Sequence, residues 1–200
     1  MAILSKSKKP KVIKDSKLRR IGREGERKVS FRLRQLYQLD ETTRYIDDVI
    51  IVDNYGNSHQ IDHIAIRHNG VFCIETKNIA GYIFGSVNGD TWTQALAKDV
   101  RNSYVSPIVQ NKTHVKVLKE VIGDRYKVNS VIVLARNNSR FITNKPSNVI
   151  NVAGLIKYLR NYDDGVYLSN EEIINIYNDI IDASSDMSLN EHINNIKGKA

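Results

Sequence analysis

The sequence has 200 residues, 41% hydrophobic and 26% charged, which is ordinary for one globular domain. A single cysteine, Cys73, excludes a disulfide framework and an all-cysteine zinc site. No apolar run approaches the roughly 18 residues of a membrane helix, and none of signal-peptide length opens the chain, so we expect a cytoplasmic protein. The net charge of +8 is concentrated in residues 1–34, which hold 13 Lys and Arg against 3 Asp and Glu. The positive field of this segment attracts polyanions such as nucleic acid or an anionic membrane surface. The alternative interpretation is that the segment is a solubilising tail.

The chain begins with a predicted flexible basic arm over residues 1–15. Apolar residues at helical spacing predict a helix after the arm, with Phe31 and Leu39 widening its apolar stripe. Gly22 and Gly25 are unusual inside a helix, because each lowers helix propensity by about 1 kcal/mol relative to alanine. We therefore expect another part of the backbone to approach closely there.

Short strands follow, because β-branched and aromatic residues alternate with turn signals. The predicted strands are residues 45–53, 59–67, 71–77 and 81–87. Asn69–Gly70, between the second and third strands, is the strongest short signal for a hairpin with a two-residue turn.

The second half has longer elements. A helix is predicted from Pro107 to a stop at Gly123, and residues 128–135 have the near-continuous apolar pattern of a strand buried on both faces. A strand at 149–152, a helix at 153–162 and a last helix with a Ser169–Glu172 capping box complete the order. This order predicts an α/β or mixed α+β fold, with a central mixed β-sheet flanked by helices. We expect one domain over residues 16–183 and a weakly ordered tail over 184–200.

The predicted hairpin carries an unusual set of charges. Its turn pairs Asp62 with Lys77 and Ile64 with Glu75, and the two-residue period of a strand places Asp62, Glu75 and Lys77 on one face. Charged groups are rarely buried unless they are paired or bound to metal. One interpretation is a plain Asp62–Lys77 ion pair with Glu75 in solvent. The other is a magnesium site with Asp62, Glu75 and the Thr76 backbone carbonyl as ligands.

These residues also carry a resemblance. Asp62, a 12-residue gap and Glu75-Thr76-Lys77 match the D…(D/E)-x-K signature of the PD-(D/E)XK nuclease superfamily, although Ile61 replaces the proline of its name. The chain resembles the nuclease-related domain (NERD) family in particular. Further matching stretches are Gly22–Glu26 (G-x-x-G-E), Gln60–His63 (Q-I-D-H), Ile74–Asn78 (I-E-T-K-N) and Pro107–His114. The resemblance covers about residues 18–122 and implies a restriction-endonuclease-like core.

The resemblance assigns catalytic roles to Asp62, Glu75 and Lys77 and adds Glu26 and Gln110 to them. Glu26 would be a third acidic group brought from the first helix towards the metal, and Gln110 would lie near the phosphate or the metal. Taken alone, Glu26 is typical of a solvated helix residue and Gln110 of a polar residue at a helix start. The implied cofactor is Mg²⁺, with Mn²⁺ able to substitute.

We therefore expect a metal-dependent nuclease that hydrolyses phosphodiester bonds, with DNA as its first expected substrate. Basic side chains are expected to hold the nucleic-acid backbone without reading its sequence. They are Lys17, Arg19, Arg20, Arg23, Arg27, Lys28 and Lys112. The alternatives are a non-catalytic or partner-activated nucleic-acid-binding module, and a protein whose basic arm binds an anionic membrane or a partner. The sequence leaves open DNA against RNA, endonuclease against exonuclease attack, and a homodimer or accessory protein.

Three other groups of residues favour structural roles. A hairpin splays His59, His63 and His68 across both faces, which leaves a zinc ion without a sensible fourth ligand. Cys73 is typical of a buried small apolar residue. Isolated aromatic residues on strands belong to a core more often than they stack on bases. They are Tyr82, Phe84 and Trp92.

Overall fold

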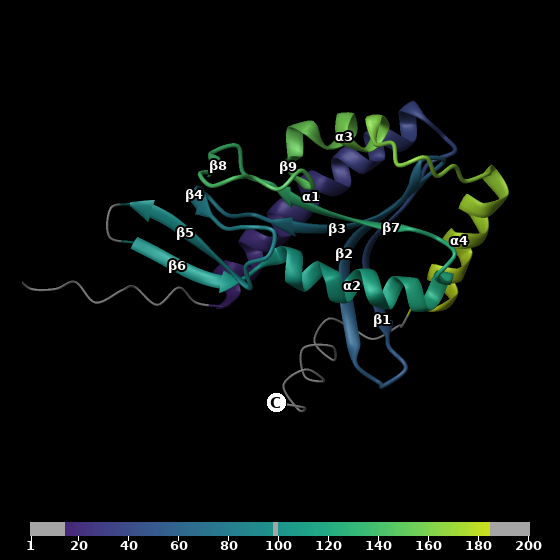
Figure 1. The fold of residues 1–200 in the computed structure, drawn as a ribbon, viewed down its shortest axis with the longest axis horizontal. Coiled ribbons are helices and arrows are strands. Elements are labelled where there is room, and N and C mark those ends of the chain that lie inside the picture. Colours follow the sequence, from purple (N-terminus) through teal and green to yellow (C-terminus); the bar gives the residue numbers. More distant parts are fainter. Residues whose placement is uncertain (1–14, 98–99, 185–200) are drawn as a thin grey trace, which may run out of the picture.

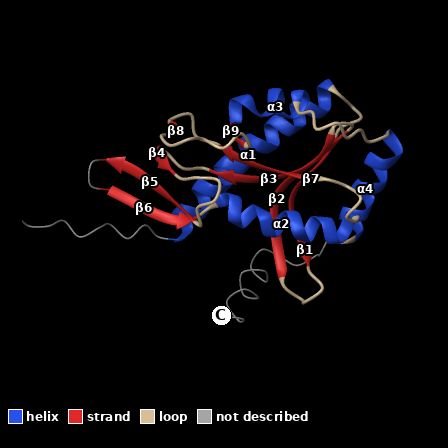
Figure 2. Ribbon diagram, in the orientation of Figure 1, coloured by secondary structure: helices blue, strands red, loops and turns tan. Residues whose placement is uncertain are grey.

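The computed structural model describes residues 15–97 and 100–184 (Figure 1). The chain combines helices and strands (Figure 2), as expected for a mixed α+β protein, with six strands in succession between α1 and α2. The elements are α1 (Asp15–Leu39), β1 (Arg44–Val52), β2 (Ser58–Arg67), β3 (Gly70–Lys77), β4 (Gly81–Phe84), β5 (Thr91–Ala97), β6 (Val100–Val105), α2 (Pro107–Ile122), β7 (Val128–Leu134), β8 (Ser139–Phe141), β9 (Val149–Asn151), the 3-10 helix η1 (Val152–Gly154), α3 (Leu155–Asn161) and α4 (Asn170–Asp182).

The central sheet has five strands in the order β1-β2-β3-β7-β9. Strands β1, β2 and β3 are antiparallel neighbours, whereas β7 runs parallel to β3 and β9 parallel to β7. Helices α1 and α3 cover one face of this sheet, and α2 and α4 cover the other (Figure 1). The predicted mixed sheet flanked by helices is confirmed.

The core follows the alternation of side chains along β3. Phe72 and Ile74 pack with Val29, Leu33 and Leu36 of α1 in one buried cluster. Cys73, on the opposite face of β3, belongs to the cluster formed with α2 and α4. A strand that is buried on both faces needs apolar residues at nearly every position. Glu75 is therefore a conspicuous charge within this strand.

A second sheet has four strands in the order β6-β5-β4-β8 and extends beyond the end of β3, on the left in Figure 1. Trp92 of β5 is fully buried and packs with Ile83 of β4 and Ile132 of β7, which joins the two sheets. Strands β5, β6 and β8 were not predicted, and the predicted strand at 81–87 ends at Phe84. Residues of β6 are mostly exposed, so they carry no alternating apolar pattern.

The predicted turn between β2 and β3 was wrong by one position. The turn residues are His68 and Asn69, and Gly70 opens β3 with a φ of 134°. The side chain of Asn69 is held inside, because its Nδ2 donates hydrogen bonds of 2.8 Å to the backbone carbonyls of Leu159 and Tyr162. Tertiary contacts with the α3 segment thus outweigh the local turn preference.

This turn changes which residues are paired. Ile64 pairs with Cys73, whereas we expected it opposite Glu75. The same register, continued one position beyond the His63–Ile74 pair, places Asp62 opposite Glu75 and not opposite Lys77. A shift of two positions leaves every side chain on its original face, since strand side chains alternate with a period of two. The prediction that Asp62, Glu75 and Lys77 share a face survives the error.

The apolar stripe of α1 is narrower than predicted. Val29, Leu33 and Leu36 are buried, but Phe31 is 57% exposed and Leu39 is 65% exposed. Phe31 lies two positions from both Val29 and Leu33, so it points about 160–200° away from the buried stripe on a helix with 3.6 residues per turn.

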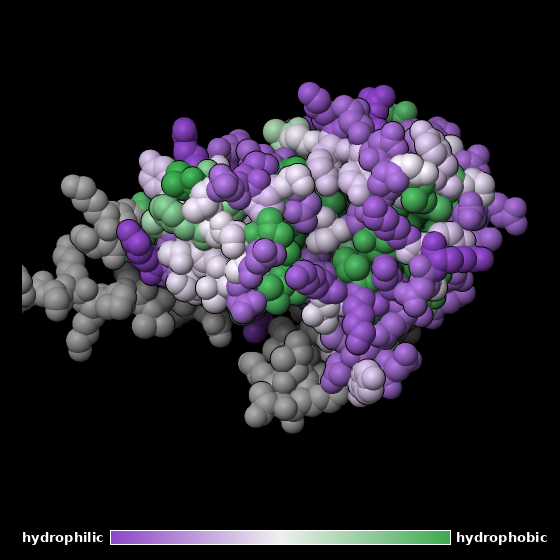
Figure 3. All heavy atoms as spheres, viewed as in Figure 1, coloured by the Kyte–Doolittle hydropathy of each residue, from purple (hydrophilic) through white to green (hydrophobic). Residues whose placement is uncertain are grey.

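The predicted arm over 1–15 and tail over 184–200 lie outside the described residues, apart from Asp15 and Ser184. The domain boundaries therefore stay a prediction. Within the described ranges, no helix is long and apolar enough to cross a membrane. The face seen in Figure 3 is largely hydrophilic, with hydrophobic residues in small separate groups.

Candidate active site

The centre of the candidate site is the end of hairpin β2–β3. The Glu75 side chain is nearly fully buried, and its Oε1 lies 2.5 Å from the Nζ of Lys77. Asp62 lies on the neighbouring strand, where its Oδ2 accepts a hydrogen bond of 2.8 Å from the backbone N–H of Thr76. Asp62 is thereby fixed beside the strand that carries Glu75 and Lys77.

The two carboxylates disturb each other. Burial and the charge of Glu75 raise the pKa of Asp62 to about 7. Burial also raises the pKa of Glu75, against the lowering effect of Lys77. Among the described residues, no donor forms a hydrogen bond to Glu75 Oε2. A buried carboxylate oxygen that accepts no hydrogen bond is uncommon in folded proteins and leaves an acceptor available to a further ligand.

Lys77 is held from two sides. Besides its contact with Glu75, its Nζ donates a hydrogen bond of 2.9 Å to Oε1 of Gln110, in the first turns of α2. Pro107 opens α2 at its N-terminal end, where its missing N–H is not needed for a helical hydrogen bond. Helix α2 therefore presents Gln110 to the ammonium of Lys77.

The position of α2 is fixed by a buried amide. Asn111 Nδ2 donates hydrogen bonds to the backbone carbonyl of Cys73 at 2.9 Å and to the hydroxyl of Ser130 at 2.8 Å. One turn after Gln110, His114 places its Nδ1 3.5 Å from Oε2 of Glu75. We had not included His114 among the site residues, although its spacing of four from Gln110 places both on one helix face.

Glu26 reaches the same region from α1. It is half-buried, and burial, followed by the charge of Asp62, raises its pKa. Glu26, Asp62 and Asp48 line a cavity of about 180 Å³ together with Arg23 and Arg27. Glu26 therefore lines the same cavity as Asp62, whereas Glu75 and Lys77 do not line it.

The donor set can be tested against a magnesium ion. In the part of the chain that the structure describes, no three His, Cys, Asp or Glu side chains form a ready metal-binding group. Magnesium, however, usually takes only one or two carboxylates, with water and substrate oxygens completing its shell. Two adjacent carboxylates, the partly buried Asp62 and the buried Glu75, fit that requirement, and Oε2 of Glu75 accepts no hydrogen bond among the described residues. The carbonyl ligand expected from Thr76 stays a prediction.

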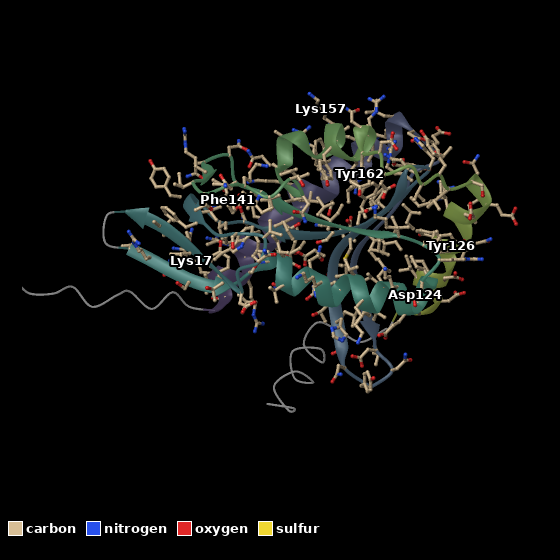
Figure 4. All side chains as sticks on the ribbon, viewed as in Figure 1. Lys17, Asp124, Tyr126, Phe141, Lys157 and Tyr162 are labelled. Carbon is tan, nitrogen blue, oxygen red and sulfur yellow. The ribbon has the colours of Figure 1, made fainter. Side chains whose placement is uncertain are left out.

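Most of the expected nucleic-acid-binding residues gather along α1. Lys17, whose side chain is labelled in Figure 4, lines a cavity of about 750 Å³ with Arg20, Arg23 and Arg27. Arg136, which follows β7, completes this basic lining and was missed because it lies far from α1 in the sequence. Since Arg23 and Arg27 also line the acidic cavity, the basic and acidic regions adjoin.

The remaining three basic residues are separate from that cavity. Lys28 lines a neighbouring cavity beside Phe31, and its Nζ lies 3.2 Å from Glu24. Arg19 and Lys112 are exposed, on α1 and α2 respectively.

The residues interpreted as structural are mostly buried. Cys73 is fully buried and donates its thiol to Asn111, and Trp92 lies in the core. His63 is buried against Asp47, with a 2.6 Å contact, and His59 contacts Asp53, so the histidines do not converge on one metal. The other two aromatics differ. Tyr82 is 52% exposed and Phe84 is partly exposed.

Comparison with known proteins identifies the family of the chain. The sequence model of the nuclease-related domain family matches residues 21–135. An uncharacterized protein of Bacillus anthracis is 34% identical over 170 residues, which cover 82% of this chain and 76% of that protein. No solved structure matched the chain. The matched region contains Glu26, Asp62, Glu75, Lys77 and Gln110.

Proposed function

The chain belongs to the nuclease-related domain family, and on that premise we propose that it is a metal-dependent nuclease that hydrolyses phosphodiester bonds. DNA is the substrate that we expect first. The observation that carries this proposal is the shared face of hairpin β2–β3. There, the partly buried carboxylate of Asp62 and the buried carboxylate of Glu75 lie on neighbouring strands, and the ammonium of Lys77 contacts Glu75. Burying like charges together costs stability unless a cation compensates them, so a functional reason is required.

We assign Asp62 and Glu75 as the ligands of Mg²⁺, with the Thr76 carbonyl and Glu26 as further oxygen donors, and we expect Mn²⁺ to substitute. Bound there, the ion would polarise the scissile phosphate and lower the pKa of a coordinated water. Glu26 supports this assignment because it lines the same cavity as Asp62.

Lys77 has the second role. Its ammonium is fixed between Glu75 and Gln110, so it can orient the attacking water and stabilise the negative charge that develops on the phosphate. The water oxygen bonds to phosphorus and releases a proton to the solvent, the bond from phosphorus to the leaving sugar oxygen breaks, and that oxygen takes up a proton from the solvent. Arg23 and Arg27 adjoin the acidic cavity and would hold the neighbouring phosphates.

A second candidate is a non-catalytic or partner-activated nucleic-acid-binding module. The 2.5 Å contact between Lys77 and Glu75 favours it, because this pair could serve only to neutralise Glu75. In that case the basic cavity along α1 would still bind nucleic acid, but the carboxylates would perform no chemistry.

The test incubates the protein with plasmid DNA in Mg²⁺, in Mn²⁺ and in EDTA, with RNA in parallel. Lys77→Ala and Glu75→Gln are compared with Lys157→Ala, which removes a lysine that points outward from α3 (Figure 4). Metal-dependent cutting by the wild type and Lys157→Ala, lost in the two site variants, supports the nuclease. Salt-sensitive binding without cutting supports the binding module. If the protein neither cuts nor binds DNA or RNA, the result contradicts both the nuclease and the binding module.

A further inference from the structure

A groove follows α1 away from the acidic site. The basic cavity of about 750 Å³ shares Glu24 and Arg27 with a second cavity of about 420 Å³, which contains Phe31, Arg32 and Val152. The basic cavity also shares Arg27 with the cavity that contains Asp62. The three cavities therefore adjoin one another along α1, and together they are here called the α1 groove. It runs from the acidic cavity past Arg136 to Phe31.

Phe31 is an exposed aromatic ring among cations. It is 57% exposed, and on the helix it lies one turn after Arg27 and Lys28 and next to Arg32. All four side chains line the same cavity. A large aromatic ring that is left in solvent and surrounded by basic groups is the arrangement by which proteins stack an unpaired base and hold the adjoining phosphates.

Away from the acidic cavity, the charge of the groove is strongly positive, since Glu24 is the one carboxylate among the described residues that line the other two cavities. The ion pairs formed within the described ranges do not include Arg20, Arg23, Arg27 or Arg136. The carboxylate of Glu24 forms an ion pair with Lys28. A row of unpaired guanidinium groups complements a polyanion and opposes the approach of a second copy of the same basic surface.

We propose that the α1 groove binds a single-stranded segment of nucleic acid. Arg20, Arg23, Arg27 and Arg136 hold successive backbone phosphates, and Phe31 stacks on a base. The ring requires an unpaired base, because the faces of bases inside a duplex are covered by their neighbours. This inference rests on the proposed function and names its substrate class, a single strand, an overhang or a frayed end.

Binding is measured on the full-length protein in EDTA, which separates it from cleavage. Fluorescein-labelled single-stranded DNA and the matching duplex are titrated against the wild type, Phe31→Ala and Leu39→Ala. Leu39 is the control, since it is an exposed apolar residue of α1 outside the groove. We expect the wild type to bind the single strand more tightly than the duplex. Phe31→Ala should lose about 5-fold or more of the affinity for the single strand, because one stacked base contributes at least that much. Leu39→Ala should bind as the wild type does.

Two further variants test the mode of binding. Phe31→Trp should retain the affinity, and its fluorescence should be quenched by the bound strand, because stacking quenches an indole ring and the natural Trp92 is buried. Arg136→Ala should weaken binding and reduce the slope of log affinity against log salt by about 1.

Two results would overturn the inference. One is that Phe31→Ala and Leu39→Ala bind the single strand with equal affinity. The other is a preference for duplex that does not depend on Phe31. These results leave the nuclease proposal intact if the wild type still cuts plasmid in Mg²⁺. Conversely, Phe31-dependent binding without cutting of any substrate supports the groove and contradicts the nuclease.

Discussion

Gly25 of α1 lies directly against Asn78, the residue that follows β3. A β-carbon added to Gly25 would lie 2.6 Å from Cβ of Asn78 and 3.2 Å from Cβ of Ala135. The side chain of Asn78 in turn donates a hydrogen bond to the backbone carbonyl of Ile21. This close seating of α1 on the end of β3 is what brings Glu26 towards Asp62, since Glu26 is the next residue of the helix.

Gly25→Ala should therefore reduce both stability and cleavage. Neither neighbouring β-carbon can move without its backbone, so we expect a loss of about 1–3 kcal/mol in the free energy of unfolding, and roughly a 10-fold loss of rate as Glu26 is displaced. Gly22→Ala is the matched control, because its nearest neighbour is the flexible end of Glu26 at 3.6 Å. Urea unfolding of that variant should show equal or higher stability. If Gly25→Ala is as stable as the wild type, the inference that Gly25 is needed for the close approach of α1 to Asn78 is wrong.

Asp62→Asn should separate metal binding from folding. Removing one of two mutually repelling carboxylates should raise the melting temperature of the metal-free protein, because the amide oxygen can still accept the Thr76 N–H bond. It should also abolish the stabilisation by Mg²⁺ that the wild type shows in a thermal shift assay. Asp182→Asn, at an exposed position of α4, serves as control. An unchanged Mg²⁺ response in Asp62→Asn would contradict the ligand assignment.

The faces of the central strands were predictable because they depend on parity alone. Asp62, Glu75 and Lys77 were placed on one face even though the turn at Asn69 was misassigned. The capping box of α4 was predictable for a similar reason. The Ser169 side chain accepts from the backbone of Glu172 and the Glu172 side chain accepts from the backbone of Ser169, so both partners are local.

Features that depend on distant partners were not predictable. Phe31 was assigned to the buried stripe because periodicity cannot show where a helix meets its sheet. Arg136 reaches the basic cavity from the segment after β7, and nothing near it in the sequence signals this role. Strand β6 is exposed and polar, so it follows no apolar pattern, and it forms because it can pair with β5.

Gln110→Ala should lower the cleavage rate without unfolding the protein. The variant removes the hydrogen bond that holds Lys77 from α2, and the ammonium is then positioned by Glu75 alone. We expect roughly a 10-fold loss in kcat with little change in KM, as for an interaction used mainly in the transition state. The exposed Gln110 side chain should contribute less than about 0.5 kcal/mol to folding.

The control for Gln110 is Thr113→Ala, at an exposed position of the same helix. Steady-state kinetics should show wild-type values for it. Equal rates in Gln110→Ala and the wild type would mean that Lys77 needs no support from α2.

The ion pair between the buried guanidinium of Arg67 and Asp40 should make the stability of the fold depend on pH. Its Nη2 lies 3.2 Å from Oδ2 of Asp40. Burial raises the pKa of Asp40, but hydrogen bonds from Thr42 and the charge of Arg67 outweigh burial and lower it below its ordinary value. A lowered pKa means that the pair stabilises the fold above the pKa of Asp40 in the unfolded chain, about 3.9, and that this contribution is lost as pH falls through the lower folded value.

Asp40→Asn should therefore cost about 1–2 kcal/mol of the free energy of unfolding at pH 7, less than a fully buried pair because solvent reaches Asp40. Urea unfolding from pH 7 to pH 3 should show this difference shrinking towards zero below pH 4, whereas a difference that stays constant over this range would refute an ionic contribution from Asp40.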